Sequence, residues 1–175
     1  MPSTDTALDP ICPLVTPTPS NPSTLATTQR PAYKPRSSDP SALSCSFTVP
    51  GDPLSATVVR AAVRTVLRAH GLSVIEEPAL SISGELVACG TRFAPGQDLY
   101  HSLRWCDGAL RIVNWDAHHA HSGSREAAVC AARRKRALLL LAAVVHECGG
   151  DWGISKSGPA AEGTRVWARL PLPGA

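Results

Sequence analysis

The sequence predicts an α/β sandwich of the α+β type, in which a mixed or antiparallel sheet is covered on one face by helices. Three observations predict it. Apolar residues recur at helical spacing over residues 52–93, alternate at strand spacing over 99–116, and repeat the same change of period between 124–146 and 152–172. The strand–helix–strand alternation of parallel sheets is missing, so the order of elements indicates two layers rather than a Rossmann fold.

The first 51 residues are expected to be a disordered tail. They hold ten of the 16 prolines, amid many Ser and Thr residues. Such a segment cannot bury enough apolar surface to offset the conformational entropy that it would lose on ordering. The folded domain is therefore expected to span residues 52–175.

The first helix is expected to run from Asp52 to His70. Asp52 is a favourable N-cap residue, Pro53 suits the first helical position, and Gly71 stands where a helix commonly ends. The apolar residues of this segment form one stripe at helical spacing, made of Val59, Ala62, Val63 and Val66.

A second helix is expected over residues 79–93. The Pro-Gly pair at 95–96 is expected to end it. Residues 99–105 then alternate between apolar and polar side chains, and residues 109–116 do so again. The Asp-Gly pair at 107–108 is a common turn between such strands, so the two segments predict a hairpin.

The last third of the chain is expected to form one long helix and a second hairpin. The helix spans about residues 124–146 and ends at Gly149-Gly150. The hairpin strands are expected at 152–157 and 164–172, where apolar residues alternate again.

Composition excludes several classes of protein. The net charge of +3 is mild and scattered, so direct binding to nucleic acid or to a membrane surface is not expected. The longest apolar run is nine residues, far short of the roughly 18 needed to span a bilayer. The N-terminus lacks the features of a signal peptide, which predicts a cytoplasmic protein. The six cysteines are widely spaced without a Cys-x-x-Cys pair, which favours reduced thiols over a disulfide framework or a zinc site.

Three segments together resemble a known family. Residues 83–95 read SGELVACGTRFAP, residues 103–116 contain LRW and LRIVNWD, and residues 163–171 read GTRVWARLP. In this order they are similar to the ATP-binding domains of anti-sigma-factor serine/threonine kinases, which belong to the histidine kinase/Hsp90-like (GHKL) ATPase group. The last segment is the most literal match, and the resemblance covers roughly two thirds of the chain. It implies a Bergerat-type ATP-binding fold, a bacterial role in transcriptional control, and ATP as cofactor.

The resemblance also implies roles for individual residues. Glu85 matches the candidate base that activates a serine hydroxyl or a water. Cys89, one helical turn later, replaces the Asn that would bind Mg²⁺, and a thiol serves Mg²⁺ poorly. Asp116 matches the residue that accepts a hydrogen bond from the adenine amino group.

The phosphate-binding segment of the family is altered as well. Its Gly-Arg-Gly-Leu corresponds to residues 135–138, in which Arg136 is kept and Ala137 replaces a glycine that would let the backbone approach phosphate. Thr164 could donate its hydroxyl to a phosphate. Because the metal and phosphate positions are both altered, ATP binding is expected to be weak and phosphoryl transfer slow or absent.

Two functions stay open at this point. The first is an ATP-binding regulator that acts on a protein partner, such as a sigma factor or its antagonist. The second is a pseudo-ATPase that keeps the fold as a protein-interaction module without nucleotide. A homodimer is compatible with either. Three histidines, His118, His119 and His121, could bind a transition metal with Asp116, but their spacing fits no closed site, and no metal ligand is expected.

Overall fold

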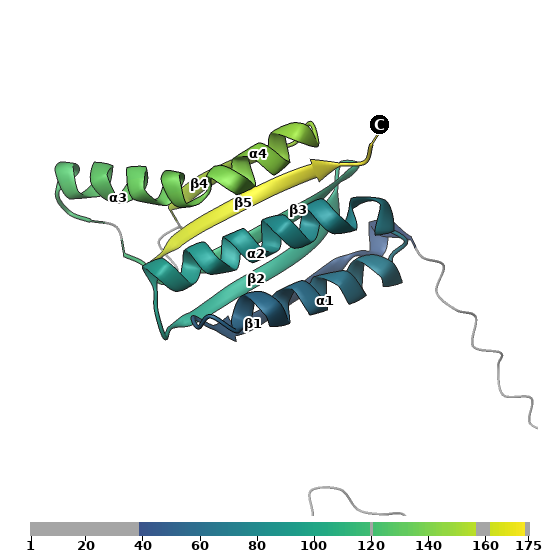
Figure 1. Ribbon diagram of the computed structural model, residues 1–175, viewed down its shortest axis with the longest axis horizontal. Helices are drawn as coiled ribbons and strands as arrows, with labels where there is room; N and C mark the ends of the chain where they lie inside the picture. The colour runs from purple at the N-terminus through teal and green to yellow at the C-terminus, as the bar shows by residue number, and fades with distance from the viewer. Residues whose placement is uncertain (1–38, 120, 157–161, 174–175) are drawn as a thin grey trace, which may run out of the picture. The chain divides into compact units, whose positions relative to one another are not determined.

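Five antiparallel strands form one sheet, and α1 (Ser55–Ala69), α2 (Glu76–Phe93) and α4 (Leu139–Glu147) lie on one of its faces (Figure 1). The computed structural model describes residues 39–119, 121–156 and 162–173, which belong to one unit, Arg36–Ala175. This arrangement confirms the predicted two-layer α+β architecture, and it selects the antiparallel sheet over the mixed one.

The secondary-structure elements follow one another in this order: η1 (Pro40–Ala42), β1 (Ser44–Pro50), α1 (Ser55–Ala69), η2 (Ser73–Ile75), α2 (Glu76–Phe93), β2 (Asp98–Cys106), β3 (Ala109–Asp116), α3 (Ser124–Ala137), α4 (Leu139–Glu147), β4 (Asp151–Lys156) and β5 (Thr164–Pro171). The strands lie in the order β1-β2-β3-β5-β4. Both predicted hairpins and the first two predicted helices are therefore present, with ends shifted by up to three residues.

The turn between β2 and β3 has the backbone that its sequence predicts. Asp107 has φ 51° and Gly108 has φ 69°. Positive φ at both central residues is what a type I′ hairpin turn requires, and Asp-Gly is a favoured pair for it. This turn fixes the register in which Cys106 pairs with Ala109 and Tyr100 with Trp115.

Strand β1 corrects the predicted boundary of the tail. It lies within residues 1–51, yet it pairs with β2 along its whole length, from Ser44 opposite Arg104 to Pro50 opposite Asp98. Proline is tolerated there because β1 is an edge strand and Pro50 is its last residue. Its outward Ser and Thr residues gave the segment the composition of a tail. The short helix η1 and the core residue Leu43, which is 1% exposed, also lie within the expected tail. Residues 1–38 of that tail lie outside the described residues.

The predicted helix over 124–146 is also corrected, because it is two helices. Leu138 has φ −106° and ψ 17° and separates α3 from α4. Figure 1 shows α4 lying over the sheet, whereas α3 runs on past the sheet. None of the helices in the described ranges is long and apolar enough to cross a membrane.

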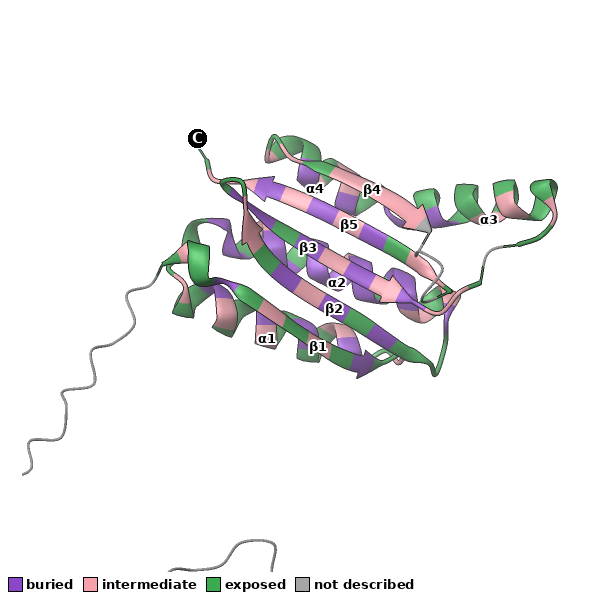
Figure 2. Cartoon of the chain, turned by 180° about the vertical axis from the view of Figure 1, so that it is seen from behind, coloured by how far each residue is buried: buried purple, intermediate pink, exposed green. Residues whose placement is uncertain are grey.

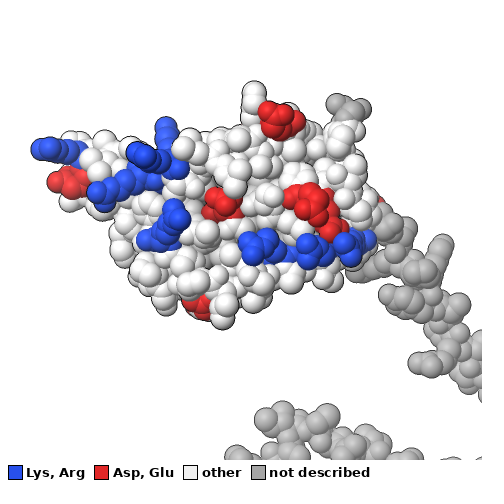
Figure 3. Space-filling model, in the orientation of Figure 1, with Lys and Arg blue, Asp and Glu red and all other residues white. Residues whose placement is uncertain are grey.

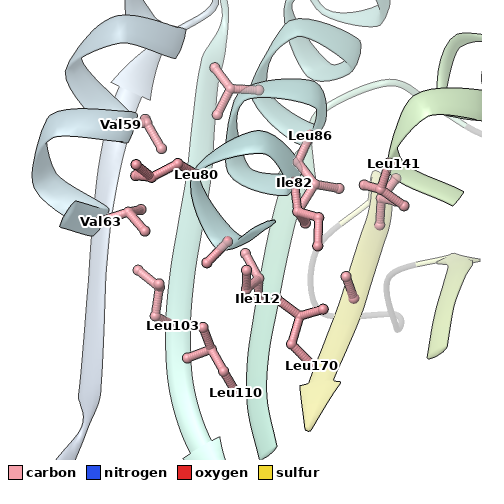
Figure 4. Packing of buried hydrophobic residues seen from close by; sticks show 14 of the residues in the cluster. Val59, Val63, Leu80, Ile82, Leu86, Leu103, Leu110, Ile112, Leu141 and Leu170 are labelled. Atoms are coloured by element: carbon pink, nitrogen blue, oxygen red, sulfur yellow. The ribbon is translucent and has the colours of Figure 1, made fainter. Parts of the chain in front are cut away.

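The core fills the space between the sheet and the helices. Figure 4 shows leucine and isoleucine side chains from both layers meeting there. Figure 2 shows the sheet from the side opposite the helices, where buried residues alternate with more exposed ones along β2, β3 and β5. The core residues that are at most 1% exposed include Ile82, Leu86, Leu103, Leu110, Ile112, Leu141 and Leu170.

The sequence predicts Asp52 as the N-cap of the first helix, but α1 begins at Ser55 and its N-cap position is Leu54, which makes no side-chain cap hydrogen bond. Asp52 instead stabilises the turn that leads into the helix. Asp52 Oδ1 accepts hydrogen bonds from the backbone N–H groups of Leu54 at 2.7 Å and Ser55 at 3.0 Å. We expect Asp52→Ala to lower the free energy of unfolding by about 1 kcal/mol, because two N–H groups at the helix end lose their acceptor. Urea denaturation of both proteins measures this difference.

The matched control is Asp98→Ala. Asp98 is exposed, and its carboxylate makes no hydrogen bond within the described residues. We expect a change below about 0.5 kcal/mol for this variant. Equal effects of the two substitutions would show that Asp52 does not stabilise the start of α1.

Candidate functional site

The candidate site lies where β3 ends, at an ion pair between Asp116 and Arg134. Asp116 is the last residue of β3 and is 0% exposed, and Arg134 on α3 is 2% exposed. Arg134 Nη1 lies 2.5 Å from Asp116 Oδ2, and Nη2 lies 3.0 Å from Oδ1. This two-pronged geometry is the strong form of an Arg–carboxylate interaction. The buried charges of both residues are therefore paired.

Three further groups surround this ion pair. The guanidinium carbon of Arg134 lies 4.0 Å from the centre of the Phe93 ring, at cation–π distance. Cys89 Sγ lies 4.0 Å from Arg134 Nη1. The backbone N–H of His118 donates to Asp116 Oδ1 at 3.2 Å. Asp116 thus accepts three hydrogen bonds from the protein, and a nucleotide has no exposed carboxylate to bind in this conformation.

Cys89 is a buried residue of the core. It is 2% exposed on α2, and burial raises the pKa of its thiol to about 11. The thiol is therefore protonated at neutral pH, whereas metal binding needs the thiolate. The position of the expected Asn supplies no ligand for Mg²⁺.

Of the other predicted site residues, some lie near the ion pair and some do not. Thr164 pairs with Asp116 in the sheet, and its hydroxyl donates to the carbonyl oxygen of His118 at 3.3 Å. Glu85 is half-buried on α2, and Arg136 is exposed in the last turn of α3. The structure therefore brings Cys89, Asp116 and Thr164 together. Among the described contacts, none joins Glu85 to that group.

A pocket of about 640 Å³ lies beside the ion pair. The end of α2, the segment after β3 and helix α3 line it, and Ala137 is part of its wall while Glu85, Cys89, Asp116 and Arg134 are not. Phe93 lines the pocket and also stacks on Arg134, so its ring stands between the pocket and the buried guanidinium.

Residues 133–136 are four consecutive basic residues, a run whose charge could attract phosphate, and they differ in burial. Arg133, Lys135 and Arg136 are exposed, whereas Arg134 points inward. Figure 3 shows Lys and Arg side chains gathered over α3 in the region where Figure 1 places this helix. The exposed members keep the charge that could attract an anion, but the inward one is already neutralised by Asp116.

The sequence marks Arg134 only as one member of the basic run at 133–136, without its buried partner, and it does not mark Cys130 at all. A signal for Arg134 exists in the helical pattern: buried Leu138, Leu141 and Val145 continue the stripe on which Arg134 lies, at intervals of four, three and four residues. A cation on a buried stripe indicates a buried ion pair. No comparable signal marks Cys130, because its neighbours come from the segment before α3.

Comparison of the sequence with models of known protein families finds no match, and comparison with curated proteins finds none either. The resemblance to anti-sigma-factor kinases therefore rests on the three sequence segments and stays a prediction.

Proposed function

We propose that this chain is a regulatory domain of the anti-sigma-factor kinase type that acts by binding a protein partner and does not transfer phosphate. Of the two functions that the sequence leaves open, this is the pseudo-ATPase. The observation that carries the choice is the buried ion pair: the carboxylate expected to bind adenine is held by Arg134 through both oxygens.

The places of the resembling segments support the family assignment within this proposal. Residues 83–95 lie mainly in α2, residues 103–116 in the β2–β3 hairpin, and residues 163–171 in β5. In the described structure β3 pairs with β5, and α2 packs over β3. Segments that are far apart in sequence thus become neighbours near Asp116, which supports the proposal that they belong to one site.

The parts needed for phosphoryl transfer are not assembled. The reaction requires a metal ion and cationic groups around the transferred phosphate, with a base that reaches the attacking hydroxyl. Cys89 is a buried protonated thiol, and Arg134 is neutralised by Asp116. Glu85 does not line the pocket. A partner-binding role needs none of these groups.

Nucleotide binding is tested by thermal unfolding with millimolar ATP, with and without Mg²⁺. We expect no change in the unfolding temperature of the wild-type chain. A ligand present at 100 times its Kd stabilises by about 2.7 kcal/mol, so binding of useful affinity would be visible. Stabilisation that appears only with Mg²⁺ would contradict the proposal and favour the ATP-binding alternative.

Cys89→Asn provides the matched variant for this measurement. It restores the residue that the family uses for Mg²⁺, but it leaves Arg134 on Asp116. We therefore expect the variant to remain insensitive to ATP and Mg²⁺. A shift produced by Cys89→Asn alone would show that the missing ligand, rather than the ion pair, keeps nucleotide out.

The partner is identified by purifying the tagged chain from its own cells and analysing the bound proteins by mass spectrometry. We expect a sigma factor or an antagonist of one, which should bind the purified chain equally well with and without ATP. Binding that requires ATP would overturn the proposed mode of action.

A further inference from the structure

Three side chains beside the pocket form a cluster with the atoms of a metal site. His118 and His121 come from the segment between β3 and α3, and Cys130 comes from α3. His118 Nε2 lies 3.3 Å from His121 Nε2 and 3.1 Å from Cys130 Sγ, and the three atoms all lie within 4.8 Å of one another. Ligand atoms around tetrahedral Zn²⁺, with Zn–N of about 2.0 Å and Zn–S of about 2.3 Å, are about 3.3–3.5 Å apart. Two of the three distances between these ligand atoms are therefore already close to this value.

The second nitrogen of His118 orients the ring for metal binding. His118 Nδ1 lies 3.1 Å from the backbone carbonyl oxygen of Phe93. A carbonyl only accepts hydrogen bonds, so Nδ1 carries a proton, and in the neutral ring Nε2 then has the lone pair, on the side of His121 and Cys130. Metal-binding histidines commonly hold their other nitrogen in this way.

Two residues of the set considered from sequence are engaged elsewhere. His119 Nδ1 lies 3.0 Å from Glu162, and Asp116 is held by Arg134. Cys130 takes their place. The expectation of no metal ligand rested on the spacing of residues in the sequence. In the fold, α3 lies against the segment that follows β3, so Cys130 contacts His118 although the two are distant in sequence.

We propose that His118, His121 and Cys130 bind Zn²⁺, with the fourth position filled from the pocket by water or an anion. Imidazole and thiolate are ligands that Zn²⁺ prefers, and they exclude Mg²⁺ and Ca²⁺. Binding converts the Cys130 thiol to a thiolate and releases its proton to solvent, so affinity rises with pH. This proposal does not depend on the proposed function.

The site also has a structural consequence for α3. Arg134 is the one residue of α3 that is buried, so the rest of this helix has little packing within the described structure. Cys130 precedes Arg134 by one helical turn. Zn²⁺ would tie the same side of the helix to the segment after β3 and so hold Arg134 on Asp116.

The test is a titration of the metal-free full-length chain with Co²⁺, followed by displacement with Zn²⁺. We expect one equivalent to bind, with visible absorption of tetrahedral cobalt and a thiolate-to-cobalt charge-transfer band. His121→Asn and Cys130→Ser should each weaken Zn²⁺ binding at least about tenfold, since each removes one of three ligands. Zn²⁺ should raise the unfolding temperature of the wild type more than that of either variant.

Matched controls come from neighbouring residues of the same kinds. His119→Asn removes the histidine that contacts Glu162, and Cys45→Ser removes a thiol of β1. Both should bind as the wild type does. His121 is exposed, so its variant should fold, and circular dichroism checks this. A charge-transfer band that is missing in the wild type, or that persists in Cys130→Ser, would overturn the proposal, as would wild-type affinity in His121→Asn. None of these readouts involves ATP or a partner.

Discussion

Arg134→Ala is expected to lower the free energy of unfolding by about 3–5 kcal/mol, the usual cost of removing one partner of a buried ion pair. The substitution leaves the Asp116 carboxylate at 0% exposure without its two guanidinium hydrogen bonds. Its remaining donor is the N–H of His118. Denaturation in urea measures the loss. An unchanged dependence of the unfolding free energy on urea concentration would show that the substitution alters stability and not the surface exposed on unfolding.

Arg133→Ala is the matched control for this prediction. Arg133 is the preceding residue of α3 and is exposed, so its loss should change the free energy of unfolding by less than about 0.5 kcal/mol. The double variant Asp116→Leu/Arg134→Met should regain much of the stability lost in Arg134→Ala, because apolar residues of similar volume often replace buried ion pairs without cost. If Arg134→Ala costs no more than Arg133→Ala, the pair does not close the site.

The fold could be predicted from the sequence where the signal is local. The alternation along β2 and β3 and the Asp107-Gly108 turn depend only on nearby residues, and the structure has both. Strand β1 could not be predicted in this way. Its partner β2 begins 48 residues after β1 ends, and an edge strand with Ser and Thr outward has the composition of a tail.

Only part of the site could be predicted, because the sequence marks individual residues but not the contacts between distant segments. Resemblance marked Asp116 and Cys89, and the structure places both beside the same guanidinium nitrogen, Nη1 of one arginine. The resemblance could not show that this guanidinium belongs to Arg134, because the contact depends on the path of the chain between β3 and α3. The same path brings Cys130 to His118. Side chains that act together only through a loop leave no fixed spacing in the sequence.

The second large effect is expected from acid, through His101. This residue lies on β2 facing the core and is 0% exposed. Its Nδ1 lies 3.3 Å from Asn114 Oδ1, while Nε2 has no hydrogen-bond partner among the described residues. Burial lowers the pKa of His101 to about 4, because a charged imidazole would lose its hydration in this position.

The direction of the pH effect follows from this lowered pKa. In the unfolded chain a histidine has a pKa of about 6.5. Between that pH and about 4 the unfolded chain binds a proton that the folded chain does not, so acid favours unfolding. The contribution of His101 to stability is fully present above the higher value, falls as the pH drops through this window, and is lost near the lower one. The total loss is on the order of 3 kcal/mol.

His101→Gln isolates this contribution, because glutamine does not titrate. Urea denaturation at pH 7 and at pH 5, with a chelator present to exclude metal, should show a smaller loss of stability in the variant than in the wild type. The matched control is His146→Gln, which replaces an exposed histidine at the end of α4 and should keep the wild-type loss. Since the two substitutions are chemically identical, a difference between them can come only from the place of each histidine. Equal losses in all three proteins would mean that His101 is hydrated well enough to be protonated in the fold, and that the core beneath β1 and β2 is not dry.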